Sequence, residues 1–468
     1  MSPPLFFFLL LLLLPFFSFY QRANGAYFKS LGVNFGQLGD DLPSASVSVS
    51  RLRHFRAGAV KIYDANPKIL EALSHTRLPV SIMVPNELIS SMAHNQSAAD
   101  DWVGSNLLPF YPKARIRFLL VGNEILSDLS DNKTRFDLVP AMTRIHRSLK
   151  SRSIHKVKVG TTLAMDTLSV SFPPSSGAFR PDISKPVMEP LLEFLTRTRS
   201  YYFADAYPYF PWAADPTHID LDYCLFRANS SKHYTDPGSN LTYTNLLDQQ
   251  LDAVAFAMAR LGFGSVKLAV AETGWPNAGD FGEIGANVYN AATYNRNLAR
   301  RMRVRPPVGT PARPGAYMPV FLFALYNENR KPGPGTERHW GFLHPNGTSV
   351  YEVDLTGRRT EFGALPLPTN NEPYEGKVWC VAREEAAGNM TAVGDAVSYA
   401  CGQGEGTCDE IQKGGKCYEP DTLVAHANYA FNSYWQQFRN SGGSCYFNGL
   451  AVRTNKDPSY GSCKFLAK

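Results

Sequence analysis

Two glutamates stand directly after short apolar runs that have the composition of β-strands. Glu272 ends the run VKLAVAE and is followed by a Thr-Gly turn and by Trp275, whereas Glu124 ends the run RFLLVGNE. A carboxyl group at the end of a strand, beside an aromatic ring, is an arrangement by which a barrel enzyme can present an acid to a sugar. Cleavage of a glycosidic bond needs one carboxylic acid that protonates the leaving oxygen and one carboxylate that attacks or stabilises the anomeric carbon. We therefore interpret the two glutamates as a candidate catalytic pair; the alternative for either one alone is a solvated strand end.

The elements that would position this pair alternate regularly along the chain. Strands are expected at residues 30–35, 59–63, 79–84, 117–121, 157–163, 203–207, 266–271 and 320–326. Helices are expected between them, among others at residues 44–55, 98–110, 136–150, 185–198, 244–261 and 286–302. Strands that are apolar on successive residues, joined by crossovers long enough for a helix, predict a parallel sheet buried on both faces. Eight such units favour an α/β fold of the (β/α)8 type, a TIM barrel, over an open doubly wound sheet.

A barrel of this kind places its chemistry in the loops that follow the carboxyl ends of the strands. Polar and aromatic residues gather at those positions, among them Asp64, Asn123, Tyr207 and Glu328. The segment after the first strand, Gly-Val-Asn-Phe-Gly, lacks the glycine spacing of a phosphate-binding loop. We therefore expect no dinucleotide cofactor, and the sequence indicates no metal site.

The N-terminal segment has the features of a secretory signal peptide. An apolar run at residues 5–14 is too short to span a bilayer, and the small-x-small residues Ala23, Asn24 and Gly25 follow it. We expect a signal peptide at residues 1–25, cleaved after Gly25. The C-terminal residues carry no hydrophobic tail, so no lipid anchor is expected. The chain is therefore predicted to be secreted to the extracellular matrix or cell wall, without a membrane anchor. We also expect a monomer.

The charge balance is slightly positive, with 47 Lys and Arg against 41 Asp and Glu and a formal net charge of +6. So small an excess, spread along the chain, does not suggest a nucleic-acid partner. It suits weak adhesion to an acidic polysaccharide matrix. Sequons for N-glycosylation fit an exported glycoprotein and stand at Asn95, Asn132, Asn229, Asn240, Asn346 and Asn389.

The seven cysteines divide the chain into two parts. Cys224 stands alone before residue 380, and six follow it at Cys380, Cys401, Cys408, Cys417, Cys445 and Cys463. This uneven spacing predicts a large domain with its own core and a small domain that depends on disulfides. We place the barrel at residues 26–360, a Pro- and Asn-rich linker at 361–377 and the cysteine-rich domain at 378–468. Six cysteines form three bridges in one of fifteen pairings, among which the sequence does not decide.

The barrel segment resembles the plant β-1,3-glucanases of glycoside hydrolase family 17, from about Leu31 to Leu355. The motif Val-Ala-Glu-Thr-Gly-Trp-Pro-Asn around Glu272 resembles the segment around the nucleophile of that family, and Val-Gly-Asn-Glu at Glu124 resembles its acid/base motif. A third block, ALYNENRKPGPGTERHWG, matches a segment with active-site acids and a lysine. The resemblance implies hydrolysis with retention of anomeric configuration, in which Glu272 is the nucleophile and Glu124 is the general acid and then the general base.

Supporting roles around the pair follow from the chemistry and the resemblance together. Asn123 is expected to hydrogen-bond either the 2-hydroxyl of the sugar or Glu272, and Tyr207 to orient Glu272 and keep it ionised. A charged cluster and aromatic rings that stack on glucose complete the expected substrate-binding residues, which are Glu328, Lys331, Glu337, Tyr63 and Trp275, with Tyr209 and Trp340 as further candidate stacking rings. The alternative for the charged cluster is an ion-pair network on the last loop. The alternative for each aromatic ring is packing beneath a loop.

The cysteine-rich segment resembles carbohydrate-binding module family 43, also called the X8 domain, from Trp379 to Phe465. The motifs that carry the resemblance are Trp-Cys-Val-Ala, Tyr-Ala-Cys-Gly, Gly-Gly-Lys-Cys and Asp-Pro-Ser-Tyr-Gly-Ser-Cys. The resemblance implies binding of β-1,3-glucan. Residues 426–438 have helical apolar spacing, so we expect a mainly α domain in which the lone His426 is structural.

The leading interpretation is a secreted, retaining endo-β-1,3-glucan hydrolase that acts on callose-like or fungal wall polymer. A second interpretation is a non-catalytic wall protein whose barrel only binds β-glucan, although the intact glutamates argue against it. A third keeps the chemistry and changes the bond, to mixed-linkage β-1,3-1,4-glucan or to transglycosylation.

Overall fold

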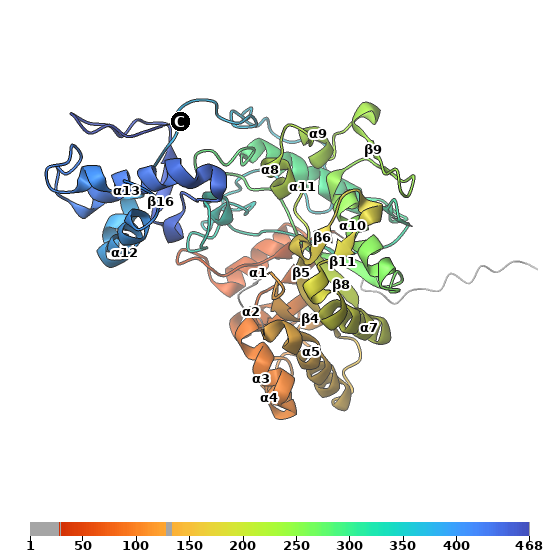
Figure 1. Cartoon of the computed structure of the whole chain (residues 1–468). Coiled ribbons are helices and arrows are strands. Elements are labelled where there is room, and N and C mark those ends of the chain that lie inside the picture. The colour runs from red at the N-terminus through yellow and green to blue at the C-terminus, as the bar shows by residue number, and fades with distance from the viewer. Residues whose placement is uncertain (1–27, 29, 128–132, 468) are drawn as a thin grey trace, which may run out of the picture.

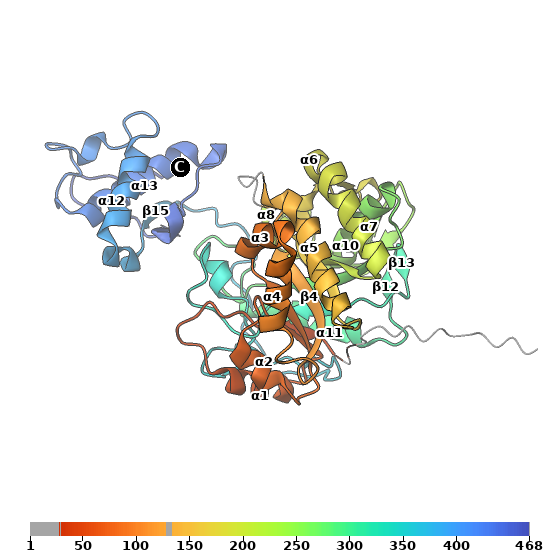
Figure 2. The same ribbon diagram turned by 90° about the horizontal axis from the view of Figure 1, so that it is seen from below.

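The computed structural model describes residue 28 and residues 30–127 and 133–467. The predicted signal peptide at residues 1–25 and the sequon at Asn132 lie outside these described residues. Within them, no helix combines the length and the apolar character needed to cross a membrane. The chain forms a barrel and a small cysteine-rich module, which lies beside the barrel in both views (Figure 1, Figure 2).

Eight parallel strands close into a barrel in the order β1-β14-β11-β8-β5-β4-β3-β2. Each strand pairs in parallel with both of its neighbours. The prediction of a (β/α)8 barrel is therefore confirmed. The strands are β1 (Gly32–Asn34), β2 (Ala59–Lys61), β3 (Pro79–Val84), β4 (Arg115–Asn123), β5 (Lys158–Ala164), β8 (Tyr201–Asp205), β11 (Lys267–Thr273) and β14 (Val320–Leu322).

Helices connect the strands and cover the outside of the barrel (Figure 2). Asparagine caps begin several of them, because an Asn side chain can accept hydrogen bonds from the free amides of the first turn. Asn66 caps α2 in this way, Asn245 caps α10 and Asn287 caps α11. The longer helices of the barrel are α1 (Ala45–His54), α2 (Pro67–Leu73), α3 (Ile89–His94), α4 (Gln96–Asn106), α5 (Thr134–Ser151), α7 (Glu189–Thr198), α8 (Tyr209–Ala214), α10 (Leu246–Arg260) and α11 (Val288–Arg303).

The expected segments match observed elements in position and differ at their ends. The last expected strand, 320–326, ends at Leu322, although Phe323 still donates to Thr273 of β11 and Leu325 to Asn34 of β1, the two strands that flank β14. The helices α2 and α3 were not expected, because segments of 7 and 6 residues are too short to display a helical pattern. Short elements in the loops also lacked a signal, namely β6 (Leu168–Val170), β7 (Ala178–Phe179), α6 (Pro181–Ile183), α9 (Leu221–Cys224), β9 (Tyr234–Thr235), β10 (Thr242–Tyr243), β12 (Gly309–Thr310) and β13 (Arg313–Pro314).

Two layers of apolar side chains hold the barrel together. The inner layer fills the barrel with aromatic rings, where Phe118 lies edge-to-face on Phe203 at a centroid distance of 5.1 Å and also contacts Phe321. The outer layer packs the strands against the helices. Because the interior is filled, the barrel is a packed core and not a pore, and binding and chemistry are confined to its two ends.

The cysteine-rich module has its own core around Phe431 and Trp435. The helix α13 (Leu423–Phe438) packs on a two-stranded antiparallel sheet of β15 (Trp379–Ala382) and β16 (Ala451–Thr454), and α12 (Met390–Cys401) packs on α13. The three disulfides join Cys380 to Cys445, Cys401 to Cys408 and Cys417 to Cys463. The expectation of a small, disulfide-rich, mainly α domain is confirmed.

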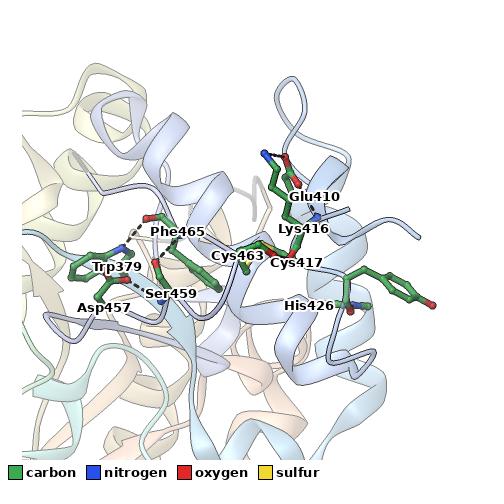
Figure 3. Close-up of a disulfide and its surroundings, with 11 residues drawn as sticks. Trp379, Glu410, Lys416, Cys417, His426, Asp457, Ser459, Cys463 and Phe465 are labelled. Atoms are coloured by element: carbon green, nitrogen blue, oxygen red, sulfur yellow. Dashed lines mark hydrogen bonds and ion pairs between the residues drawn. A yellow bond between two sulfur atoms is a disulfide. The ribbon is translucent and has the colours of Figure 1, made fainter. Parts of the chain in front are cut away.

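The Cys417–Cys463 bridge lies among hydrogen bonds that tie the C-terminal segment to the module (Figure 3). The indole of Trp379 donates to the carbonyl of Phe465 at 3.3 Å, and the amide of Phe465 donates to the hydroxyl of Ser459 at 3.0 Å. The ring nitrogen Nε2 of His426 lies 2.8 Å from the carbonyl oxygen of Tyr418, which is the structural contact expected for this histidine.

The expected linker is bound to the barrel along part of its length. The backbone amide of Gly285 donates to the carbonyl of Asn370 at 2.6 Å, and the side chain of Asn287 donates to those of both Asn370 and Asn371. The module then contacts the same side of the barrel. Arg383 forms an ion pair with Asp280, and the amide of Gly333 donates to the hydroxyl of Tyr446 at 2.5 Å. The module therefore adjoins the loops that follow β11 and β14.

We expect the Cys417–Cys463 bridge to be the larger contributor to module stability when compared with Cys401–Cys408. The two bridges are separated by 46 and 7 residues of sequence, and loop closure restricts the unfolded chain more for the longer separation. Replacing Cys417 and Cys463 by Ala should lower the free energy of unfolding of the module by about 2–5 kcal/mol, and by about 1–2 kcal/mol more than the same change at the short bridge. Calorimetry of the full chain measures both. The Cys224→Ala variant, which removes a buried free thiol of the barrel, should leave the module transition unchanged. Equal losses for the two bridges would contradict the expectation.

Candidate active site

The carboxyl ends of the strands enclose a cleft of about 450 Å³ at one end of the barrel. Three acids line it from three strand ends: Glu124 follows β4, Asp205 ends β8 and Glu272 lies in β11. The other charged and aromatic lining residues include Asp166, Lys331, Glu337, Tyr207, Phe210 and Trp340. The two glutamates singled out in the sequence are therefore brought together at the face where a barrel carries its chemistry.

Glu272 is held as a carboxylate by three donors. The ammonium of Lys61 lies 2.6 Å from its Oε1, the hydroxyl of Tyr63 donates to Oε1 at 2.5 Å, and the hydroxyl of Tyr207 donates to Oε2 at 2.7 Å. Burial opposes ionisation of Glu272, but the charge and hydrogen bond of Lys61 and the two tyrosines outweigh it, so the net effect lowers the pKa of Glu272. The side chain of Lys61 is fully buried, so this ion pair is shielded from water.

Glu124 has the opposite electrostatic environment. Burial raises its pKa to about 7, and the negative charge of Glu272 adds to the effect. The backbone places it sharply at the end of β4, because Gly122 has φ +75° and Glu124 itself has φ +50°. A non-glycine residue in the left-handed region costs about 1–3 kcal/mol and is most often retained at functional sites. At neutral pH the cleft therefore holds one ionised glutamate and one glutamate that is protonated in part of the molecules.

Asp205 and Lys61 belong to this cluster and were not singled out in the sequence. Asp205 lies opposite Glu272 in the β8–β11 ladder, where a register shift follows Val270. Burial raises the pKa of Asp205 well above its usual range, and the charge of Glu272 adds to the rise. The signal that could have revealed both residues is a charged side chain inside an otherwise apolar strand, since such residues are almost never fully buried unless they are paired.

The remaining expected polar residues divide between the cleft and the loops that support it. Lys331 and Glu337 form an ion pair of 2.8 Å, and both line the cleft. Glu328 is buried and accepts a hydrogen bond of 2.8 Å from the backbone amide of Leu38. The side-chain oxygen of Asn123 accepts a hydrogen bond of 2.9 Å from the hydroxyl of Thr162, and in the described part of the chain no hydrogen bond joins Asn123 to Glu272.

The expectation that Trp275 stacks on sugar is wrong. Its side chain is 0% exposed, its indole donates to the carbonyl of Gly285 at 2.8 Å, and it packs against the rings of Trp212 and Tyr209. Trp275 is therefore a buried residue that supports the loop after β11, and its ring is not available to stack on a sugar.

Trp340, one of the candidate stacking rings of the sequence, does line the cleft, and so does Phe210. Phe210 is 48% exposed, and it lines the cleft beside Trp340, with 5.8 Å between the ring centroids. Tyr63 uses its hydroxyl on Glu272, and its ring faces the ammonium of Lys61 at 4.1 Å. Its role in the structure is therefore to hold Glu272 and not to offer a free platform.

Two carboxyl groups with pKa values displaced in opposite directions can divide acid and base work between them. The ionised Glu272 can attack an electrophilic carbon, and the protonated Glu124 can donate to a leaving oxygen. Lys331, Glu337, Phe210 and Trp340 supply charged, hydrogen-bonding and aromatic surfaces along the same cleft. This combination suits a neutral, hydroxyl-rich substrate such as a glycan.

Comparison with known proteins gives two matches to family models. Residues 31–355 match the model described as Glycosyl hydrolases family 17, and residues 378–452 match the X8 domain. The chain is 52% identical over 437 residues to the "Probable glucan endo-1,3-beta-glucosidase A6" of Arabidopsis thaliana, which covers 93% of this chain and 90% of that protein. It is 38% identical over 449 residues to the "Glucan endo-1,3-beta-D-glucosidase" of Olea europaea, which covers 96% of this chain and 95% of that protein.

Solved structures are similar over the barrel. CJP38, described as a beta-1,3-glucanase and allergen of Cryptomeria japonica pollen, superposes with a TM-score of 0.66 at 36% identity, covering 70% of this chain and 99% of that chain. One of two plant β-glucan endohydrolases described as having distinct substrate specificities superposes with a TM-score of 0.63 at 34% identity, covering 69% of this chain and 100% of that chain.

Replacing Lys61 by Met should destabilise the fold, because it leaves the carboxylate of Glu272 buried without its cation. Breaking a buried pair in this way costs about 3–5 kcal/mol. In the variant, the pKa of Glu272 rises, so the penalty for burying its charge is present above the unfolded-state pKa and disappears as the pH falls and Glu272 is protonated. Chemical denaturation at several pH values should therefore show the difference from the wild-type chain shrinking on acidification.

The matched control is Lys158→Met. Lys158 is a half-buried lysine at the other end of the barrel, and its ammonium bonds to the backbone carbonyl of Thr198. This variant should show no such convergence at low pH. If the Lys61→Met and Lys158→Met variants have the same pH dependence, the assignment of Lys61 as the cation that holds Glu272 ionised is wrong.

Proposed function

Because the chain belongs to glycosyl hydrolases family 17, we propose that it is an endo-β-1,3-glucan hydrolase that works by a double displacement between Glu272 and Glu124. The observation that carries the mechanism is the divided environment of the two acids, with three donors on Glu272 and a raised pKa for Glu124. The curated relatives named as glucan endo-1,3-β-glucosidases, which this chain matches over nearly its full length, support the choice of linkage.

In the first step, Glu272 attacks the anomeric carbon while Glu124 gives its proton to the glycosidic oxygen. The bond to the leaving sugar breaks, the leaving sugar departs as an alcohol, and a glycosyl ester forms on Glu272. Lys61, Tyr63 and Tyr207 keep the attacking carboxylate ionised and fix its orientation. The ionised carboxylate of Glu272 is a stronger nucleophile than a protonated carboxyl group.

In the second step, Glu124 removes a proton from water, which attacks the same carbon and releases Glu272. Glu124 changes from general acid to general base because Glu272 loses its charge when the ester forms. Since the negative charge of Glu272 helps to raise the pKa of Glu124, formation of the neutral ester removes that contribution. Glu124 then favours its ionised form, which is the form that a general base requires.

The cleft is open enough for an internal stretch of polymer. Phe210 and Trp340 offer aromatic surface, and Lys331 with Glu337 offers charged groups that hydrogen-bond sugar hydroxyls. Asn123 lies one residue before Glu124, where it can contact the 2-hydroxyl of the reacting sugar. The X8 module is proposed to bind the same β-1,3-glucan, and its attachment beside the barrel raises the local concentration of polymer.

Secretion to the cell wall, N-glycosylation and a monomeric state belong to the same proposal. The three disulfides fit an oxidising compartment. The sequons within the described residues are all exposed, as attachment of a glycan requires; they are Asn95, Asn229, Asn240, Asn346 and Asn389.

The mechanism predicts a covalent intermediate on Glu272. A 2-fluoro laminaribiosyl fluoride should inactivate the full chain, and peptide mapping should find the added mass on Glu272.

In Glu124→Ala, kcat on laminarin should fall by about 10²–10⁴, since the proton donor is lost. The variant Glu352→Gln changes an exposed acid that pairs with Arg359 and should keep wild-type activity. Inversion of configuration in the first product, seen by NMR, would exclude the double displacement.

The linkage preference is tested with the products themselves. The chain should release short oligosaccharides of mixed length from laminarin and should act more slowly on barley mixed-linkage glucan. Products longer than the added substrate would instead indicate transglycosylation. No release of reducing ends from either polymer, with intact binding, would establish a non-catalytic glucan-binding protein.

The pH dependence of kcat/KM should be bell-shaped. Activity falls as the pH rises above about 7, because Glu124 loses the proton it must donate. Activity also falls on the acidic side, as the pH drops through the lowered pKa of Glu272 and protonates the nucleophile. In Tyr207→Phe, loss of one donor to Glu272 should move the acidic limb to higher pH. The control Tyr202→Phe removes a buried hydroxyl that contacts Thr167 and should leave the acidic limb in place.

A further inference from the structure

The end of the barrel opposite the cleft is strongly basic. Three strands begin with a cationic residue, namely Arg115 in β4, Lys158 in β5 and Lys267 in β11. A fourth cation, Arg199, lies two residues before β8. These charges are close enough to affect one another. Burial lowers the pKa of Lys158, and the charges of Lys267 and Arg199 lower it further.

Two adjoining depressions lie on this face, with volumes of about 1110 Å³ and 580 Å³. They share Thr356 and Arg358, so together they form one continuous hollow. We call the exposed arginines that line it the arginine face; they are Arg53, Arg56, Arg77, Arg115, Arg300, Arg303, Arg305 and Arg358. Among residue 28 and residues 30–127 and 133–467, no Asp or Glu lines either depression.

The positive charge of the arginine face is not balanced within the described residues. Arg53, Arg56, Arg77, Arg303 and Arg358 have no side-chain hydrogen bond or ion pair there, and the others bond to backbone carbonyls or an amide oxygen. Two carboxylates of the segment that leads to Arg358 are engaged elsewhere. Asp354 accepts from the hydroxyl of Thr356 and from neighbouring backbone amides, and Glu352 pairs with Arg359.

Helix ends account for only part of this charge. α1 and α11 both end at this face, and the partial negative charge of a helix C-terminus favours cations in the last turn. Each terminus supplies roughly half of one elementary charge. Two termini therefore offset about one of the eight arginines, and the rest of the charge needs a different explanation.

We propose that the arginine face binds a carboxylated polysaccharide, a polyuronate. A guanidinium group is planar and pairs with a carboxylate through two parallel hydrogen bonds, which a row of exposed arginines can repeat along a polymer with one carboxylate per sugar. The hollow is continuous, as a linear chain requires, and concave, which disfavours the flat surface of a membrane. Among the described residues that line it, Phe28 is the one aromatic residue, and it is buried, so these residues offer no ring to stack on the bases of a nucleic acid.

The position of the face gives such binding a physical consequence for the whole molecule. Because the cleft and the arginine face lie at opposite ends of the barrel, a polyanion held at one end leaves the other open. The chain would be retained by an acidic matrix through exposed ion pairs, which are individually weak and act together. Retention of this kind is reversible and sensitive to salt.

The experiment measures binding of the full chain to polygalacturonate, with fully methyl-esterified polygalacturonate as the uncharged ligand. The wild-type chain should bind only the charged polymer. Raising the salt concentration from about 0.1 M to about 1 M shortens the screening length from ~10 Å to ~3 Å and should abolish binding. In a second experiment, Ser replaces four residues of the arginine face, Arg300, Arg303, Arg305 and Arg358. The affinity of this variant for polygalacturonate should be at least about tenfold lower than that of the wild-type chain.

The matched control replaces four exposed cations outside this face, Lys68, Arg147, Lys185 and Lys413, by Ser and so has the same net charge. It should bind polygalacturonate within about twofold of the wild-type chain. Both variants should hydrolyse a soluble laminari-oligosaccharide at the wild-type rate, which establishes that they are folded. The binding assay does not depend on hydrolysis, so it stands apart from the proposed activity.

Three outcomes would overturn the proposal. One is equal binding of the charged and the esterified polymer. Another is an equal loss of binding in the two variants, which would assign the effect to net charge alone. The third is tighter binding to vesicles of anionic lipid, or to duplex DNA, than to polygalacturonate at the same concentration of negative charge.

Discussion

The ion pair between Lys61 and Glu272 is the interaction on which the rest of the structure depends. Its two partners lie 2.6 Å apart and are almost fully withdrawn from water, which costs several kcal/mol for each charge. They come from β2 and β11, which are separated in the barrel by β1 and β14. The pair therefore exists only when the barrel has closed in the correct order. The same interaction therefore selects the fold and fixes the charge of the Glu272 carboxylate.

The same pair sets the charge of its neighbours. Lys61 neutralises Glu272, and the residual field of Glu272 and burial keep the pKa values of Glu124 and Asp205 raised. Three acids can thus share one enclosed space without three negative charges. The barrel interior beneath them is filled by apolar side chains, most of its volume by aromatic rings. The opposite end carries the uncompensated arginines, and the protein is electrically polarised along the barrel axis.

The fold could be predicted because its signal is periodic and repeated eight times, and the two glutamates because each ends a strand. Residues whose roles depend on distant partners could not be predicted. Lys61 looks like one polar residue in a strand until Glu272 is placed beside it. Trp275 looks like a sugar platform until the rings of Trp212 and Tyr209 enclose it. The disulfide pairing could not be predicted either. It depends on which cysteines lie close together in the folded module, and their spacing in the sequence does not determine this.

One carboxylate joins the catalytic barrel to its appended module. Asp280 accepts a hydrogen bond from the amide of Gly335 and pairs with Arg383, so it holds the loop after β14 and the first strand of the module at the same time. Lys331 and Glu337 belong to that same loop and reach the cleft. The module is therefore fixed to the same loop that supplies Lys331 and Glu337 to the cleft.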